Sequence, residues 1–299
     1  MKIRDILKKN RTVSFEFFPP KTQEGISALF RAIDRLKQFQ PSYVSVTCGA
    51  GGSTRDLTEE ISLGIKRQAG LEVMTHVTCS GQSKDDVIDV LGRLEQEMID
   101  NVIGLRGDPP RGQADFMAAE DGFAHATDLI EHMKSNFGFG IAAACYPEGH
   151  PESPDIETDL AFTRKKVDAG AEFLITQLFF SNDDFFAFRD RARKAGITVP
   201  IVAGVLPILS SAQIRRFTEL CGATIPKELD SQLDRFVDDD HAARELGVEY
   251  TTDQVRELWD NGAEGIHFYS LNRSYSISKI LRNLGLPDHS GEAADDASS

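Results

Sequence analysis

Ser14-Phe15-Glu16-Phe17-Phe18-Pro19-Pro20-Lys21 is the stretch that decides the fold of this 299-residue chain. From Thr12 to Phe17 apolar and polar residues alternate, so the pleat of a strand turns the aromatic side chains to one face and Glu16 to the other. The two prolines cannot donate to a strand ladder, so the strand ends there and leaves Glu16 near its carboxyl end. Catalytic groups in parallel α/β folds lie at that end.

Glu16 is therefore the first candidate for a catalytic group. A carboxyl among aromatic side chains has a raised pKa, which suits a general acid that works near neutral pH. We expect such a raised pKa for Glu16. A structural ion pair with a neighbouring Lys or Arg is the alternative, because strand ends also carry such pairs.

Short β-branched or apolar runs recur along the chain, at intervals that suit a strand followed by a helix. They begin near Thr12, Ser42, Leu71, Asn101, Gly138, Glu172, Val199 and Gly265. Helix-start patterns lie between them at Ser83, Ser181 and Thr251. No G-x-G-x-x-G follows the first run, so the pattern predicts a (β/α)₈ TIM barrel over residues 1–286 and disfavours a doubly wound sheet. The long seventh interval predicts an extra acidic helical insertion at residues 226–247, between strands 7 and 8.

The composition indicates one soluble, cytoplasmic domain. A hydrophobic content of 40% suffices for a full core, and a net charge of −14 argues against a nucleic-acid partner. The four cysteines form no C-x-x-C pair, which disfavours zinc and disulfide frameworks and fits a reducing compartment. No apolar run approaches a membrane span, and we expect neither export nor membrane insertion. Residues 287–299 are expected to be a disordered acidic tail.

Polar side chains occur at the carboxyl ends of most predicted strands. They are Glu16, Thr47, His76, Arg106, Asp108, Tyr146, Gln177 and Tyr269. Each of them alone could be a satisfied core or rim residue. Because all strands of a barrel end at the same face, the set as a whole predicts an active site there.

A series of motifs, in the same order along the chain, resembles methylenetetrahydrofolate reductase. They are Ser14–Lys21, Val44–Thr47, Leu105–Pro110, Tyr146–Pro151, Ile175–Phe180 and His267–Arg273. The resemblance implies a (β/α)₈ flavoprotein that holds FAD and takes electrons from NADH or NADPH. It also implies that the protein is a homo-oligomer, and that it reduces 5,10-methylenetetrahydrofolate to 5-methyltetrahydrofolate in a ping-pong reaction.

The resemblance assigns roles to individual residues. Glu16 matches the general acid that helps to open the imidazolidine ring of the folate. Asp108 matches a residue beside the flavin and the pterin, where its negative charge tunes the flavin potential. Gln177 matches an amide that contacts either substrate, since an amide both donates and accepts hydrogen bonds. Arg273 would help to bind the folate.

For FAD the resemblance implies a larger set and no metal ion. The set is Thr47, Cys48, Ala50, His76, Arg106, Gly107, Asp108, Ala126, Tyr146, His150, Asp159, Lys165 and Lys166. Arg and Lys can neutralise a pyrophosphate, and small residues let the backbone approach the cofactor. Asp159 could hold a ribose hydroxyl. An exposed helix face is the alternative for Lys165 and Lys166.

The chain departs from the family pattern at several positions. Cys48 and His125 stand where the family has Tyr, and Phe162 stands where it has Asn. Ser211 stands where the family has a Phe that stacks on the nicotinamide. Such a stack is worth about 0.5–1.5 kcal/mol, so we expect weaker nicotinamide binding and not its loss. The same departure motivates an alternative, in which an iron-sulfur or ferredoxin-type partner subunit supplies the electrons.

Two further functions compete with this one. A metal-dependent barrel hydrolase would use His76, His267 and Asp108, but the first strand lacks the H-x-H of such enzymes and the ligand spacing is not compact. A non-catalytic flavin or folate binder is the other candidate, and the presence of Glu16 argues against it.

Overall fold

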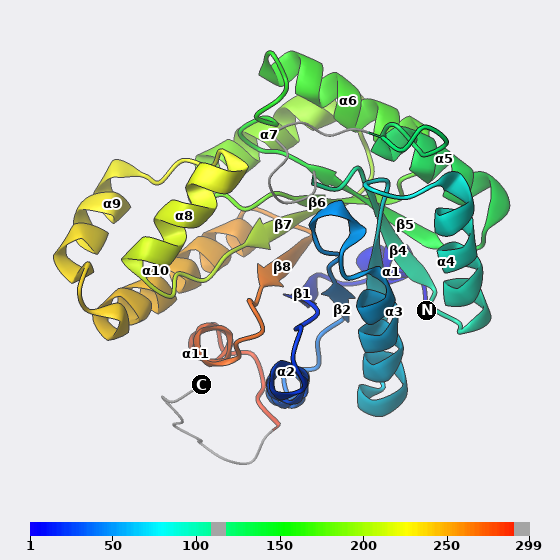
Figure 1. The fold of residues 1–299 in the computed structure, drawn as a ribbon. Coiled ribbons are helices and arrows are strands. Elements are labelled where there is room, and N and C mark those ends of the chain that lie inside the picture. Colours follow the sequence, from blue (N-terminus) through cyan, green and yellow to red (C-terminus); the bar gives the residue numbers. More distant parts are fainter. Residues whose placement is uncertain (109–117, 290–299) are drawn as a thin grey trace.

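Eight parallel strands form a closed barrel at the centre of the computed structural model, which describes residues 1–108 and 118–289 (Figure 1). The strands are β1 (Thr12–Phe17), β2 (Tyr43–Val46), β3 (Val73–Thr78), β4 (Asn101–Leu105), β5 (Gly140–Cys145), β6 (Phe173–Thr176), β7 (Ile201–Val205) and β8 (Gly265–Tyr269). Each strand pairs with the next one in the chain, and β8 pairs with β1. The predicted (β/α)₈ TIM barrel is confirmed.

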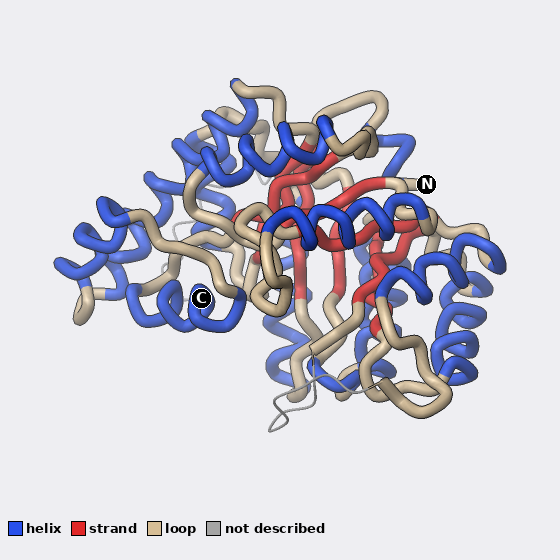
Figure 2. Tube along the Cα trace, turned by 90° about the horizontal axis from the view of Figure 1, so that it is seen from above, coloured by secondary structure: helices blue, strands red, loops and turns tan. Residues whose placement is uncertain are grey.

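Helices surround the strands, as the view from above shows (Figure 2). They are α1 (Ile3–Leu7), α2 (Gln23–Lys37), α3 (Arg55–Gly64), α4 (Lys84–Gln96), α5 (Ala126–Asn136), α6 (Ile156–Asp168), α7 (Asn182–Lys194), α8 (Ser211–Cys221), α9 (Lys227–Leu233), α10 (Asp240–Asp260) and α11 (Tyr275–Asn283). Short turns of helix add η1 (Ala50–Gly52), η2 (Ile65–Ala69) and η3 (Asp234–Phe236). Ser83 and Asp86 form the expected capping box of α4. A helix does begin after Ser181, which precedes α7 without a side-chain cap. The helix start expected at Thr251 was wrong, because Thr251 lies inside α10.

The strands separate two apolar layers. Alternate residues such as Phe15 and Phe17 pack outward against the helices. Tyr43, Phe173 and Val202 belong to a smaller cluster inside the barrel, which also includes Ile3 and Leu7 of α1. Ile3 N donates to Asn101 Oδ1 at the first residue of β4, so α1 closes the amino end of the barrel. The carboxyl end is left for the site.

The connection from β7 to β8 is the longest and has a core of its own. It contains α8, α9, η3 and α10, which Figure 1 shows together on one side of the barrel. Ile214, Leu229 and Leu233 pack there against Leu178 and Phe180, which follow β6. The segment from 226 to 247, where the sequence predicts an acidic insertion, includes α9, η3 and the start of α10.

The end of the chain is described only in part. Asp288 pairs with Arg282 at 2.7 Å, and His289 N donates to Gln38 O. Residues 290–299, most of the expected acidic tail, lie outside the described residues. Within 1–108 and 118–289, no helix combines the length and the apolar composition that a bilayer crossing needs.

Asn101 should be a stability determinant without being part of the chemistry. Its side chain is fully buried and accepts from Ile3 N at 2.8 Å, while Nδ2 donates to Met1 O at 2.8 Å and to Glu72 Oε1 at 2.9 Å. Asn101→Ala leaves these groups without partners, so we expect a loss of about 2–4 kcal/mol in the free energy of unfolding. Urea denaturation measures the loss. Asn136→Ala, which removes an exposed amide that donates to His132 O of the same helix, is the control. Equally small losses in both variants would contradict the assignment.

Candidate functional site

Glu16 points into the barrel near its carboxyl end. The alternation of β1 places Phe15 and Phe17 in the outer apolar layer and leaves Ser14 and Glu16 on the inner face. In the strand register Glu16 lies between Ser45 of β2 and Tyr269 of β8. The strand direction and the inward orientation of the carboxylate are as the sequence predicts.

Two imidazoles flank the carboxylate. Glu16 Oε2 lies 3.4 Å from Nε2 of His76 on β3 and 3.6 Å from Nε2 of His267 on β8. The Glu16 side chain is 19% exposed, that of His76 9% and that of His267 1%. Glu16 is therefore the member of this group that is most accessible from the barrel mouth.

The expected rise in the Glu16 pKa is wrong. Burial does raise the pKa of this carboxyl, but interactions with His267 and His76 outweigh burial and lower the pKa from 4.5 to about 2. The structural alternative expected a Lys or Arg beside Glu16. The structure places two imidazoles there instead. The carboxyl group of Glu16 is therefore ionised near neutral pH.

His267 is fixed in place on every side. Its Nδ1 lies 2.7 Å from Ser14 Oγ and its Nε2 lies 3.2 Å from Ser45 Oγ. The ring stacks on Tyr43 at a centroid distance of 5.9 Å and meets Tyr269 edge-on at 5.7 Å. Neither Ser14 nor Ser45 was among the predicted site residues.

A signal for these residues was nevertheless present in the sequence. Ser14, Ser45 and His267 each lie two positions before a strand-end residue, which are Glu16, Thr47 and Tyr269 respectively. Because side chains alternate along a strand, such positions share the inner face with the residue at the strand end.

The loops after β2, β3 and β4 meet at the backbone of Asp108. Its carbonyl oxygen accepts from Gly51 N at 3.1 Å and from Ser80 Oγ at 2.8 Å. Gly107 has a φ of +82°, and a Cβ there would lie 3.0 Å from the Cβ atoms of Thr78 and Ser80. Only glycine fits this turn. The Asp108 side chain is exposed at the barrel mouth, and residues 109–110 of the motif lie outside the described residues.

A second group gathers after β4 and β5. Arg106 forms a bidentate pair with Glu152 at 2.6 and 2.7 Å. The rings of Tyr146 and His150 meet edge-on at 4.7 Å, and Lys166 Nζ lies 5.6 Å from the Tyr146 ring.

Asp159 lies buried beside this group. It is 4% exposed, and Ser153 Oγ donates to it at 3.3 Å. Burial raises the pKa of Asp159 and lowers that of Lys166. The expected FAD residues Arg106, Tyr146, His150, Asp159 and Lys166 are thus brought together.

The chemistry of these donors fits a dinucleotide. Lys166 is a mostly buried cation whose Nζ donates to Ala144 O at 2.8 Å, so a nearby phosphate would offset its desolvation. Arg106 pairs with Glu152, which is 61% exposed and can yield to a phosphate at little cost. The small residues of η1 and Gly107 allow close backbone approach.

The remaining expected residues are more dispersed. Thr47, Cys48 and Ala50 follow β2 and are partly buried, and Ala126 is the first residue of α5. Lys165 is exposed and lies over the ring of Phe162 at 4.9 Å, which matches the exposed-face alternative.

Gln177 and Arg273 follow strands of the barrel. The Gln177 side-chain oxygen accepts from Leu178 N at 2.9 Å, directly after β6. Arg273 is exposed in the turn after β8, and its backbone N donates to Ser270 O. Ser270 Oγ in turn donates to the Glu16 carbonyl, so this turn is tied to β1.

Ser211 has a packing role. It is 1% exposed, and its Oγ donates to Leu233 O at 2.9 Å, which ties α8 to α9. The side chain at this position therefore contacts the inserted helices in the structure and does not face the barrel mouth. An aromatic ring there would disrupt this contact.

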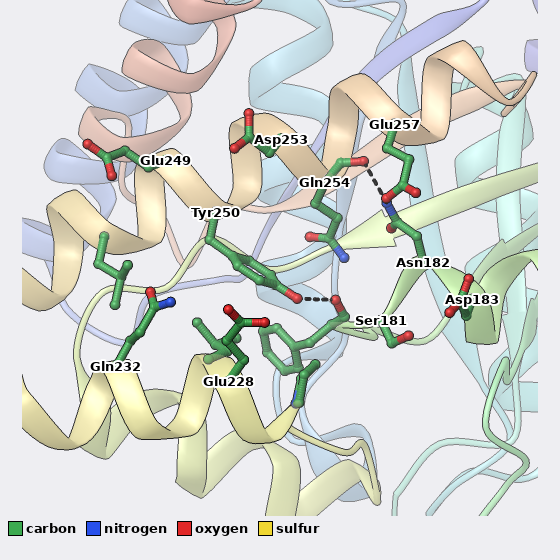
Figure 3. A pocket seen from close by; sticks show the side chains of 14 residues that line it. Ser181, Asn182, Asp183, Glu228, Gln232, Glu249, Tyr250, Asp253, Gln254 and Glu257 are labelled. Atoms are coloured by element: carbon green, nitrogen blue, oxygen red, sulfur yellow. Dashed lines mark hydrogen bonds between the residues drawn. The ribbon is translucent and has the colours of Figure 1, made fainter.

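A cavity of about 670 Å³ lies away from Glu16, between α9, α10 and the segment after β6 (Figure 3). Its lining includes the acidic side chains of Asp183, Glu228, Glu249, Asp253 and Glu257 and no Lys or Arg. Gln254 Nε2, at the wall, donates to Phe179 O at 3.0 Å, and Tyr250 Oη donates to Phe180 O. This wall therefore supports the backbone that follows Gln177. None of the expected site residues lines the cavity.

The hydrolase alternative finds no support in the described residues. His76 and His267 both face Glu16, and no set of three His, Cys, Asp or Glu side chains within 1–108 and 118–289 is arranged as a metal site.

The lowered pKa of Glu16 predicts a specific pH dependence of stability. Because the pKa falls from 4.5 to about 2 on folding, the ionised carboxylate stabilises the fold above 4.5, and this contribution is lost as the pH falls towards 2. The difference in unfolding free energy between wild type and Glu16→Gln should therefore shrink across that window. Urea midpoints measured at a series of pH values test this; a difference that is constant or grows on acidification would contradict it.

Comparison with known proteins identifies the family. The family model described as methylenetetrahydrofolate reductase matches residues 2–285. The chain is 40% identical over 97% of its length to methylenetetrahydrofolate reductase (NADH) 1 of Arabidopsis thaliana, but spans only 51% of that relative. It is 37% identical over 92% of its length to 5,10-methylenetetrahydrofolate reductase of Escherichia coli, and spans 90% of that protein.

A solved structure shares the fold at low sequence identity. It is an uncharacterized protein from Clostridium thermocellum that binds two copies of 5-methyl-5,6,7,8-tetrahydrofolic acid, with a TM-score of 0.60 and 15% identity over 94% of this chain and 96% of that one. This likeness bears on the fold alone. On the evidence of the family model and of the E. coli relative, the chain belongs to the methylenetetrahydrofolate reductase family.

Proposed function

We propose that this protein reduces 5,10-methylenetetrahydrofolate to 5-methyltetrahydrofolate. The observation that carries the proposal is the carboxylate of Glu16, held between two imidazoles at the mouth of a barrel that belongs to this family. The reaction adds one hydride and one proton to the substrate and opens its imidazolidine ring. The site therefore needs a proton donor that faces the substrate.

The chain supplies that donor as a group. The low pKa of Glu16 leaves its carboxylate ionised at rest, so in the proposed step the proton reaches it from an adjacent imidazole. His267 is 1% exposed and cannot meet a substrate, whereas Glu16 Oε2 adjoins both imidazoles and has the most exposed side chain of the three. In the proposed step a proton passes from an imidazole to Glu16 and from Glu16 to a ring nitrogen of the folate.

FAD is the proposed cofactor, and when bound it would supply the hydride transfer. Arg106, Lys166 and His150 would hold its phosphates, and Asp159 would hold a ribose hydroxyl. The glycines of η1 would allow it to approach the backbone closely. Asp108 would lie beside the flavin and the pterin. Gln177 would contact either substrate, and Arg273 the folate.

NADH or NADPH is the proposed electron donor, and the reaction would be ping-pong. The protein would be a homo-oligomer. The name of the Arabidopsis relative includes NADH, which supports a nicotinamide donor. The partner-subunit alternative was motivated by Ser211, whose side chain is used in the contact between α8 and α9. Anaerobic mixing of the purified protein with NADH, NADPH or a reduced ferredoxin tests the donor. If reduced ferredoxin bleaches the flavin and neither NADH nor NADPH does, the partner subunit is the electron donor instead.

Glu16→Gln should separate the two halves of the reaction. The amide cannot deliver a proton, so folate reduction should slow by roughly 10²–10⁴ or more, while reduction of the flavin by its donor is nearly unchanged. Rapid-mixing measurement of each half-reaction decides this. Glu245→Gln, which removes a surface pair with Lys279, is the matched control. Equal slowing of both half-reactions would show that Glu16 is structural.

Asp108→Asn should raise the midpoint potential of the bound flavin. Loss of a negative charge beside the isoalloxazine favours its electron-rich reduced form. Dye-coupled potentiometric titration measures the shift. Asp253→Asn, at an exposed side chain of α10, should leave the potential unchanged. A potential that is the same in wild type and Asp108→Asn would place this carboxylate away from the flavin.

A further inference from the structure

Ser45 shares an imidazole nitrogen with the catalytic carboxylate. It lies within β2, is fully buried, and stands opposite Glu16 in the register of β1 and β2. Its Oγ is 3.2 Å from His267 Nε2, while Glu16 Oε2 is 3.6 Å from the same atom. The hydroxyl is therefore nearer to this nitrogen than the carboxylate is.

The two oxygens compete for Nε2. If Nε2 carries a hydrogen, Ser45 Oγ can accept a hydrogen bond from it, which weakens the hydrogen bond from the imidazole to the Glu16 carboxylate. If Nε2 carries a lone pair, the Ser45 hydroxyl can donate to it, which a carboxylate cannot do. The second arrangement favours the state in which the proton is on Glu16, because donation to the Nε2 lone pair stabilises the neutral imidazole.

The other side of His267 permits both arrangements. Ser14 Oγ lies 2.7 Å from Nδ1 and 3.3 Å from Ile266 O. This hydroxyl can donate to Nδ1, or it can donate to the carbonyl and accept from Nδ1. Stacking on Tyr43 and edge contact with Tyr269 hold the ring itself in place. For His267, the balance between the two proton positions therefore depends on the contacts at Nε2.

We propose that Ser45 is a positioning residue for proton delivery, because its hydroxyl limits the ion pair between His267 and Glu16 and so leaves Glu16 able to pass a proton to the substrate. The proposal rests on the proposed function. No proton is gained or lost by Ser45 in the step: one proton leaves the imidazole, moves to Glu16, and ends on the folate nitrogen.

The ionisable side chains described around Glu16 come from β2, β3 and β8. His76 faces it from β3 and His267 from β8. Among the described residues, Tyr43 of β2 and Tyr269 of β8 are further ionisable side chains against the group, and burial raises the pKa of both phenols, so they stay neutral. A pH profile between weak acid and weak base therefore reports on Glu16 and the two imidazoles as a coupled set.

Ser45→Ala tests the proposal through the folate half-reaction. A tighter ion pair holds the proton more firmly, so we expect oxidation of the reduced flavin by methylenetetrahydrofolate to slow about tenfold, the effect of losing one hydrogen bond. The same ion pair should move the alkaline limb of the pH profile to higher pH, by up to about one unit. Flavin reduction by the donor should be unchanged.

Two further variants separate hydrogen bonding from packing. Ser45→Cys nearly keeps the volume but donates and accepts weakly, so it should resemble Ser45→Ala. Ser62→Ala removes a fully buried hydroxyl that has no hydrogen-bond partner among the described residues, and it should behave as wild type. Wild-type kinetics in Ser45→Cys would mean that Ser45 only fills space, and would overturn the proposal.

A second readout does not depend on turnover. Nitrogen-15 NMR of labelled histidine in the holoenzyme should show the titration midpoint of His267 at higher pH in Ser45→Ala than in wild type. An unshifted midpoint together with an unshifted kinetic limb would overturn the role of Ser45. Failure of the wild-type protein to transfer electrons to the folate would instead overturn the proposed function, while the NMR result would still decide whether Ser45 controls His267.

Discussion

The contact of one carboxylate with two imidazoles is the interaction on which the site depends. A buried charge is costly unless it is paired, and Glu16 finds its partners on β3 and β8. β8 reaches Glu16 only because it closes the barrel against β1. The closure of the barrel therefore also lowers the pKa of Glu16, because it brings His267 against the carboxylate.

The rest of the structure serves this arrangement from two directions. At the amino end, α1 and the Asn101 hydrogen bonds close the barrel and complete its interior core. At the carboxyl end, the Asp108 carbonyl joins the loops after β2, β3 and β4, while Arg106 and Lys166 place positive charge near the ends of β4 and β5. A protein with a net charge of −14 thus keeps a local environment that suits an anionic cofactor.

The fold was predictable from the sequence because strand and helix patterns are local and repeat. The pKa of Glu16 was not, because its direction depends on residues that are far away in the sequence and adjacent only in the closed barrel. Thr251 shows the same limit for a helix: its pattern suggests a start, but Asp239 caps α10 upstream and Thr252 Oγ1 bonds back to Val248 O within the helix. That Ser14, Ser45 and His267 line the site could have been predicted, because side chains alternate along each strand.

The most direct test of the account needs neither a nicotinamide nor a partner protein. The flavin of the purified protein is reduced by light under anaerobic conditions, with EDTA as the sacrificial electron donor, and then mixed with 5,10-methylenetetrahydrofolate, while the flavin absorbance and the folate products are followed. We predict that the flavin is reoxidised and that one equivalent of 5-methyltetrahydrofolate forms per flavin. A protein that carries no flavin, or a reduced flavin that persists in the presence of the folate, would contradict it.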